Sequence, residues 1–226
     1  MSGKPFVLAI DGPAGAGKST TARAVATALG FAYLDSGALY RCVALAALEA
    51  GVSPEDDAAL GALAPTLEIR QAVDGRFTLN GRDVTGLIRS PEVSQAASKS
   101  SACPSVRAAL VDIQRGAIAP PGTVAEGRDI GTVIFPEADL KVFLDAEPPE
   151  RTRRRTLELE AKAAPAEAIA RVGREIEERD RRDSTRAVAP LAKAKDALVI
   201  DTTFLSFDEV VARIVDEVEF RRRGAK

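Results

Sequence analysis

The stretch GPAGAGKST at residues 12–20 constrains the fold of this chain more than any other part of the sequence. Residues 12–19 match the pattern G-x-x-x-x-G-K-S/T, a phosphate-binding loop (P-loop) that lies between a buried strand and a helix. Both neighbours are present. An apolar run at residues 6–10 precedes the motif, and an alanine-rich helical pattern follows it until Gly30. The sequence therefore predicts a strand, a P-loop and a helix, and with them an α/β fold.

The residue types of this motif suit a nucleoside triphosphate. Glycines allow the backbone to turn several N–H groups towards one anion, and the start of the helix adds the positive end of its dipole. Lys18 would reach the β- and γ-phosphates, and the Ser19 hydroxyl would ligate Mg²⁺. The expected nucleotide-binding residues are Gly12, Pro13, Ala14, Gly15, Ala16, Gly17, Lys18, Ser19 and Thr20. The motif alone leaves kinase, GTPase and ATPase open, although the absence of an N-K-x-D motif counts against a GTPase.

The composition argues against several classes of protein. The 226 residues, enough for one sizeable domain, carry a formal net charge of −2, so no bulk positive field recruits nucleic acid or an acidic membrane. Aromatic residues make up 4% and tryptophan is absent, which disfavours base stacking. Two cysteines, Cys42 and Cys103, and no long apolar run predict a reduced, cytoplasmic protein. Histidine is absent, so any chemistry must work without imidazole.

The rest of the chain alternates between apolar runs and helical patterns. This alternation predicts a parallel sheet with helices on both faces. The further strands are expected at residues 31–35, 123–127, 140–145 and 197–201. The helical pattern at residues 37–51 ends in a second glycine.

Two segments depart from this alternation. Residues 66–90 alternate apolar and polar side chains around turn signals at Asp74-Gly75 and Asn80-Gly81, which predicts a small antiparallel meander. Residues 150–186 are rich in arginine, aspartate and glutamate, and they predict two polar helices broken near Pro165. This hairpin would be a mobile lid over a phosphate site or a solvated surface hairpin.

Polar side chains follow three of the expected strands. Ser36 stands in a cap-like position and Arg41 in the next helical turn, while Arg128 and Asp129 leave the strand at 123–127 between glycines. Ligands of open α/β sheets bind at the carboxyl ends of the strands, so these residues suggest a second, anionic substrate. Ser36 as a helix cap and Arg128 with Asp129 as a local ion pair remain alternatives. Asp145, at the end of the strand at 140–145, is a weaker candidate for Mg²⁺.

Four segments together are specific. IDGPAGAGKST, LDSGALYR, EGRDIGTVIFP and RDRRDSTRAVAPL, in this order and spacing, resemble the bacterial cytidylate kinase family, in its longer bacterial type. The resemblance implies one P-loop kinase domain over residues 1–226, with a five-stranded parallel core, a substrate-binding insert at about 66–98 and a lid at about 147–186. It implies that ATP phosphorylates CMP and dCMP, in pyrimidine metabolism, with Mg²⁺ as cofactor. We expect no nucleic-acid or membrane partner and, because no coiled coil is evident, a monomer.

The same resemblance assigns roles to individual residues. The acceptor phosphate would be held by Ser36, Arg41 and Arg128. Cytosine would be read by Ser98, Arg107 and Asp129. The sugar hydroxyls would be bound by Asp183, and the phosphates would be covered by Arg179 and Arg186. The catalytic set would be Lys18, Arg128, Arg179 and Arg186.

The spacing of the lid residues adds a geometric expectation. Arg179, Asp183 and Arg186 lie at positions i, i+4 and i+7, so a continuous helix would carry them on one face. If the helix ends near Ser184, Arg186 leaves this alignment.

Two other functions stay open at this stage. The first is a different small-molecule P-loop kinase, for UMP, AMP or shikimate. Uracil reverses the donor pattern of cytosine at two positions, so a site built for cytosine would leave buried groups unpaired with it. The second is a nucleotide-binding regulatory module without turnover, which would release no ADP with any monophosphate.

Overall fold

The computed structural model describes residues 4–160 and 165–224, and its centre is a five-stranded sheet in the order β2-β6-β1-β7-β8. All neighbouring strands of this sheet run parallel. The strands are β1 (Phe6–Asp11), β2 (Ala32–Asp35), β6 (Gly122–Gly127), β7 (Leu140–Asp145) and β8 (Leu198–Asp201). Each of the five expected strands is confirmed, with ends that differ from the prediction by at most one residue.

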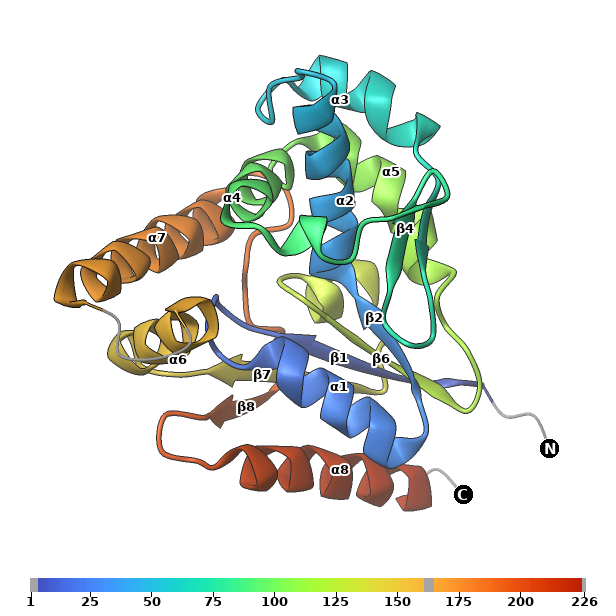
Figure 1. Ribbon diagram of the computed structural model, residues 1–226. Helices are drawn as coiled ribbons and strands as arrows, with labels where there is room; N and C mark the ends of the chain where they lie inside the picture. Colours follow the sequence, from blue (N-terminus) through green and yellow to red (C-terminus); the bar gives the residue numbers. More distant parts are fainter. Residues whose placement is uncertain (1–3, 161–164, 225–226) are drawn as a thin grey trace.

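Helices cover both faces of this sheet (Figure 1). The helices α1 (Lys18–Leu29) and α8 (Phe207–Gly224) pack on one face, against Leu8 and Ile10 of β1. The helix α2 (Ser36–Glu49) packs on the other face, against Ala9. Because successive side chains of a strand point to opposite faces, the uniformly apolar run of β1 supplies both cores.

The junction between β2 and α2 corrects one prediction. The N-cap of α2 is Asp35, whose side chain accepts a hydrogen bond from the backbone N–H of Ala38. Ser36, expected in the cap-like position, is the first residue of the helix. The strand therefore ends in the capping carboxylate itself, which leaves the Ser36 hydroxyl available for another partner.

The region between α2 and β6 contains the predicted meander. Its antiparallel sheet consists of β3 (Ile69–Gln71), β4 (Phe77–Leu79) and β5 (Arg82–Asp83). Asn80 and Gly81 both have positive φ, 50° and 78°, as a two-residue hairpin turn requires. The flanking helices are α3 (Asp57–Leu63), η1 (Ala64–Thr66), η2 (Leu87–Arg89), α4 (Pro91–Ser100) and α5 (Pro104–Arg115).

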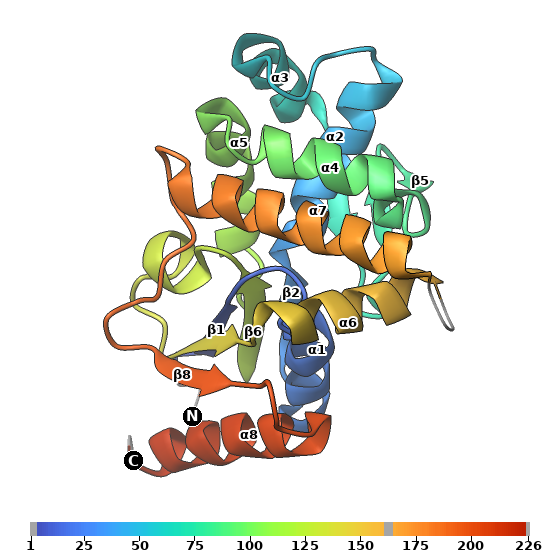
Figure 2. The ribbon, with the colours of Figure 1, turned by 90° about the vertical axis from the view of Figure 1, so that its left-hand side faces the viewer.

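Two polar helices lie between β7 and β8, as predicted. They are α6 (Pro148–Glu160) and α7 (Ala166–Thr185), which lie side by side, and α7 also lies beside α4 (Figure 2). Pro165 directly precedes α7, and residues 161–164 of the expected lid fall outside the described residues. We call α6 and α7 the lid helices; that they move remains a prediction.

Across the part of the chain that is described, no helix combines the length and the apolar character that crossing a membrane requires.

Candidate active site

A cavity of about 510 Å³ opens where the carboxyl ends of β1, β2 and β6 meet α4 and the lid helices. Its walls come from the P-loop, α2, α4, the residues after β6 and both lid helices. Of the residues predicted from sequence to bind the phosphates or the acceptor, it is lined by Ala14, Gly15, Gly17, Lys18, Ser19, Thr20, Ser36, Arg41, Arg107, Arg128, Asp129, Arg179, Asp183 and Arg186. The fold therefore brings segments separated by more than a hundred residues to one site.

The P-loop adopts a conformation that its glycines make possible. Gly15 and Gly17 have φ values of +75° and +82°, and a Cβ atom on Gly12 would lie 2.0 Å from the carbonyl oxygen of Leu144. Side chains at these positions would be strained or would collide with β7. The Lys18 ammonium is buried and donates to the Pro13 carbonyl oxygen at 2.7 Å. Burial, and then the charge of Arg128, lower the pKa of Lys18 to about 7, against the raising effect of Glu126.

A carboxylate that sequence reasoning missed lies beside the P-loop serine. Ser19 Oγ donates to Glu126 Oε1 at 2.6 Å, and burial, together with nearby Asp35, raises the pKa of Glu126. The signal available in the sequence was its place at the end of β6, directly before Gly127. Asp145, the weaker candidate, accepts a hydrogen bond from the N–H of Ala146 and does not line the cavity.

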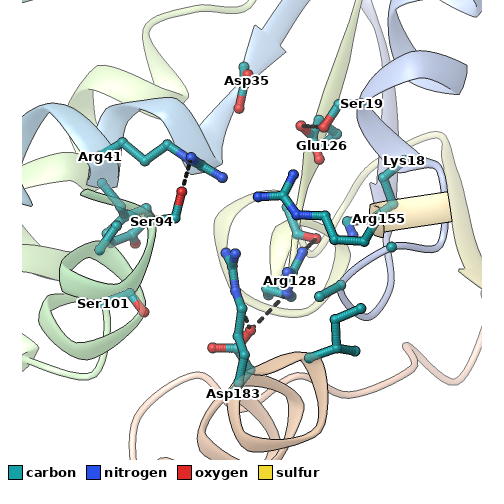
Figure 3. A pocket seen from close by; sticks show the side chains of 18 of the residues that line it. Lys18, Ser19, Asp35, Arg41, Ser94, Ser101, Glu126, Arg128, Arg155 and Asp183 are labelled. Carbon is teal, nitrogen blue, oxygen red and sulfur yellow. Dashed lines mark hydrogen bonds and ion pairs between the residues drawn. The ribbon is translucent and has the colours of Figure 1, made fainter. Parts of the chain in front are cut away.

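Arginines converge from three sides on the middle of the cavity. Figure 3 shows Arg41, Arg128 and Arg155 extending into the same space. Arg41 Nη1 donates to Ser94 Oγ at 2.6 Å, and Arg128 Nε donates to Asp183 Oδ2 at 2.9 Å.

Arg179 adds a further cation at the same place. Its Nε lies 3.8 Å from Asp183 Oδ2, and burial, then the charge of Arg128, lower its pKa to about 9. Burial, then Arg89, lower the pKa of Arg41 to about 10. Arg41, Arg128 and Arg179 are partly buried guanidinium groups in one cavity, which makes this space suited to phosphate groups.

A second charged cluster occupies another part of the cavity wall. Asp129 lies between Arg107, which pairs with Oδ2, and Arg186, whose Nη2 lies 3.3 Å from Oδ1. All three side chains are buried. The buried ring of Tyr40, which sequence reasoning did not single out, lies 5.5 Å from the guanidinium carbon of Arg107. A buried carboxylate with two guanidinium groups and an aromatic ring offers donors, an acceptor and a flat apolar face within one wall.

Arg186 lies apart from the helical stripe in which it was expected. The helix α7 ends at Thr185, and Arg186 has an extended backbone with φ −62° and ψ 142°. Its Nε donates to the Ala189 carbonyl oxygen at 2.7 Å, and its other end faces Asp129. Arg179 and Asp183 do share one face of α7, so the stripe is two residues long.

The two serines assigned to the substrate differ in position. Ser36 lines the cavity and donates to Gln114 Oε1 at 2.6 Å. Ser98 is buried in α4 beside the cavity wall without lining it, and its hydroxyl finds no partner in the described ranges. Ser94 and Ser101, one turn to either side of Ser98, line the cavity instead.

This fold and this site define a P-loop phosphotransferase with a helical lid. The P-loop forms one wall of the cavity, Arg107, Asp129 and Arg186 belong to a second wall, and Arg155 and Arg179 of the lid helices line it as well. The chain belongs to the cytidylate kinase family, whose family model matches residues 8–220.

Individual relatives are similar over nearly the whole chain. A cytidylate kinase from Methylococcus capsulatus is 53% identical over 207 residues, covering 91% of this chain and 93% of the relative. Cytidylate kinases from Solibacter usitatus and Pseudomonas aeruginosa are 51% and 49% identical, covering 96% and 97% of this chain and 94% and 97% of their own lengths. An uncharacterized protein from Eubacterium ventriosum, solved by crystallography, has a TM-score of 0.50 at 11% identity, covering 95% of this chain and 98% of that chain; this likeness concerns the fold alone.

Proposed function

We propose that this chain transfers the γ-phosphoryl group of ATP to CMP and dCMP and releases ADP with the corresponding diphosphate. The observation that carries the proposal is the buried cluster of Arg107, Asp129 and Arg186 in a cavity that also contains the P-loop. The P-loop suits a triphosphate donor, and the cluster suits a polar base. The family membership and the names of its relatives support the same substrates.

The donor would bind along the P-loop. Backbone N–H groups from Gly12 to Thr20 and the Lys18 ammonium would surround its phosphates. Mg²⁺ fits here because the Ser19 hydroxyl and the Glu126 carboxylate, 2.6 Å apart, are the hard oxygen donors that this ion prefers. These two residues would hold it, and the bound ion would neutralise phosphate charge.

The acceptor would bind across the cavity from the donor. Arg41, Arg128 and Ser36 would hold its phosphate, and Asp183 would accept hydrogen bonds from its sugar. Cytosine carries a donor amine beside two acceptor atoms, so Asp129 together with Arg107 complements it. Ser98 would take part only if α4 shifts towards the base, because its hydroxyl is buried outside the lining.

The reaction itself needs positioning more than covalent help from the protein. A bond would form between the γ-phosphorus and an acceptor phosphate oxygen, while the bond to the β-phosphate oxygen breaks and ADP leaves. Lys18, Arg128 and Arg179 would stabilise the charge on the transferring group. Arg186, the fourth residue of the predicted catalytic set, faces Asp129. It would therefore help to orient the carboxylate that binds the base instead of contacting the transferring phosphoryl group.

We further propose a single P-loop kinase domain that works as a cytoplasmic monomer. The small antiparallel sheet and α4 would form the acceptor side of the site, and the lid helices would close over the phosphates. The insert packs into the core cluster that contains Ala9 of β1, and the lid helix α7 contacts α4 of the insert through the Arg182 to Gln95 hydrogen bond at 3.1 Å.

A coupled assay of ADP release tests this function directly. We expect CMP and dCMP to support turnover far better than AMP, GMP or shikimate, and Lys18→Ala to lose it. A protein that hydrolyses or transfers nothing with any monophosphate would be a regulatory module instead. Equal or better rates with AMP would mean that the acceptor has been misassigned.

A further inference from the structure

Both lid helices hold the backbone of a single P-loop residue. Asp180 of α7 accepts a hydrogen bond from the N–H of Ala14 through Oδ1, at 2.9 Å. Arg151 of α6 pairs with Oδ2 of the same carboxylate and donates to the carbonyl oxygen of Ala14 at 3.0 Å. The N–H and the C=O of one residue are thus both bound by side chains that lie more than 130 positions away in sequence.

The arginine in this contact is itself fixed. Its Nε donates to the Ala146 carbonyl oxygen at 3.0 Å, and the side chain is almost fully buried. Its backbone lies so close to the P-loop that a Cβ atom on Gly15 would come within 2.8 Å of the Arg151 carbonyl oxygen. Close packing of this kind leaves α6 little freedom to slide along the P-loop while the contact is made.

Arg151 and Asp180 lie outside the lining of the cavity, whereas their neighbours belong to it. Arg154 and Arg155, one turn further along α6, and Arg179, directly before Asp180 in α7, all line the cavity. The pair therefore leaves the phosphate space free. The charge of Asp180 also favours the protonated forms of Lys18 and Arg128.

We propose that Asp180 and Arg151 are positioning residues, a latch through which the lid helices align their arginines with the P-loop during phosphoryl transfer. This inference rests on the proposed function, because it concerns the transfer step of that same site. The latch makes no contact with substrate and acts through Arg179 and Arg155. A displacement of about 1 Å at a transferring group can cost on the order of 100-fold in rate.

The experiment compares the variants Asp180→Asn, Arg151→Lys and their double with the wild type, at saturating ATP and CMP and also with each varied. Glu177→Gln, which removes an exposed carboxylate from α7, is the matched control. We expect each single variant to lower kcat about 10- to 100-fold with little change in KM for CMP, because the alignment of Arg179 is lost while the acceptor contacts remain. We expect the double to be no slower than the slower single, since both residues act through one contact.

Hydrogen exchange gives a second readout that needs no turnover. The peptide that contains Ala14 should exchange faster in Asp180→Ala, which removes the acceptor of the Ala14 N–H, than in the wild type or in Glu177→Gln. If Asp180→Asn melts below the assay temperature, Arg151→Lys is compared with the wild type in its place. This variant keeps the positive charge but loses the geometry of the guanidinium. Asp180→Glu restores the carboxylate, so its kcat should lie above that of Asp180→Asn. A contact that serves only stability would not require this recovery of kcat.

Three results would overturn the latch. These are a wild-type kcat in both single variants, faster exchange at Ala14 with unchanged kcat, and a double variant whose loss is the product of the two single losses. Failure of the proposed function looks different, because the wild type itself would then release no ADP with CMP.

Discussion

At the scale of single residues, Asp11 connects the P-loop strand with the loop that follows β6. Its Oδ1 accepts from the N–H of Ile130 at 2.8 Å, and its Oδ2 accepts from the N–H of Gly131 at 2.7 Å. Asp129 directly precedes these two residues, so Asp11 fixes the start of η3 (Ile130–Ile134), where Asp129 is the N-cap residue. Burial raises the pKa of Asp11 from 3.8 to about 6, against the lowering effect of the two hydrogen bonds.

This raised pKa predicts a particular pH dependence of stability. Between about pH 4 and about pH 6 the native state binds more protons at Asp11 than the unfolded state, so the free energy of unfolding falls as pH rises through this window. The effect is at most about 3 kcal/mol, since each unit of pKa shift corresponds to about 1.4 kcal/mol. Asp11→Asn cannot titrate, so its unfolding free energy should fall less than that of the wild type over the same window.

Urea denaturation at pH 4.5 and at pH 7 measures this difference. Comparing the two proteins removes the contributions of the other titrating groups. The pH-independent cost of the substitution cancels because each protein is judged by how much its free energy of unfolding changes between the two pH values. An equal change in the free energy of unfolding with pH for the wild type and Asp11→Asn would show that the carboxyl group of Asp11 titrates as it does in the unfolded chain.

At the scale of elements, one side chain fastens the small antiparallel sheet to the central sheet. Gln71, the last residue of β3, donates through Nε2 to the Tyr33 carbonyl oxygen at 2.8 Å and accepts at Oε1 from the N–H of Asp35 at 3.1 Å. Because β2 is an edge strand, this amide takes the place of a neighbouring strand at the end where Asp35 caps α2.

We expect Gln71→Ala to lower the free energy of unfolding by about 1–3 kcal/mol, since it leaves a donor and an acceptor of β2 without their partner. Arg70→Ala is the control, because the neighbouring side chain points to the other face and forms an exposed pair with Glu68. Urea denaturation of both variants checks this, and equal losses would mean that the Gln71 amide contributes nothing specific.

The elements that the sequence predicted share a local cause. Apolar runs, glycines with positive φ at Gly30 and Gly81, and Pro165 before α7 act over a few residues, so pattern alone located them. Asp35 as the cap of α2 was missed because a following serine is also a good cap, and only the backbone decides between the two.

The site was harder to predict because its contacts are long-range. The P-loop residues and the arginines of the lid follow from motifs and from resemblance. The hydrogen bonds of Glu126 with Ser19 and of Asp180 with Ala14 join residues that are 107 and 166 positions apart. Local sequence patterns extend over a few residues, so they cannot predict such contacts. Arg186 lies outside the helical stripe because α7 ends at Thr185, which is the alternative that its position near Ser184 had left open.

At the scale of the whole molecule, the buried cluster of Arg107, Asp129 and Arg186 is assembled from distant parts of the fold. Arg107 comes from α5, Asp129 from the loop after β6, and Arg186 from the segment that follows α7. These parts meet only when α5, the loop after β6 and the segment after α7 are all in place. The proposed preference for cytosine would therefore be a property of the assembled molecule, and it is the central claim of the proposed function.

The ratio of kcat/KM for CMP to kcat/KM for UMP, in the wild type and in Asp129→Asn and Asp129→Ala, tests this claim most directly. Each group left unpaired by the wrong base costs about 1–3 kcal/mol, so we predict a wild-type ratio of about 10 to more than 100. We predict that the ratio falls towards one in both variants, with thermal melting confirming that they are folded. A wild-type ratio near one, or a folded Asp129→Ala that keeps the wild-type ratio, would contradict the account.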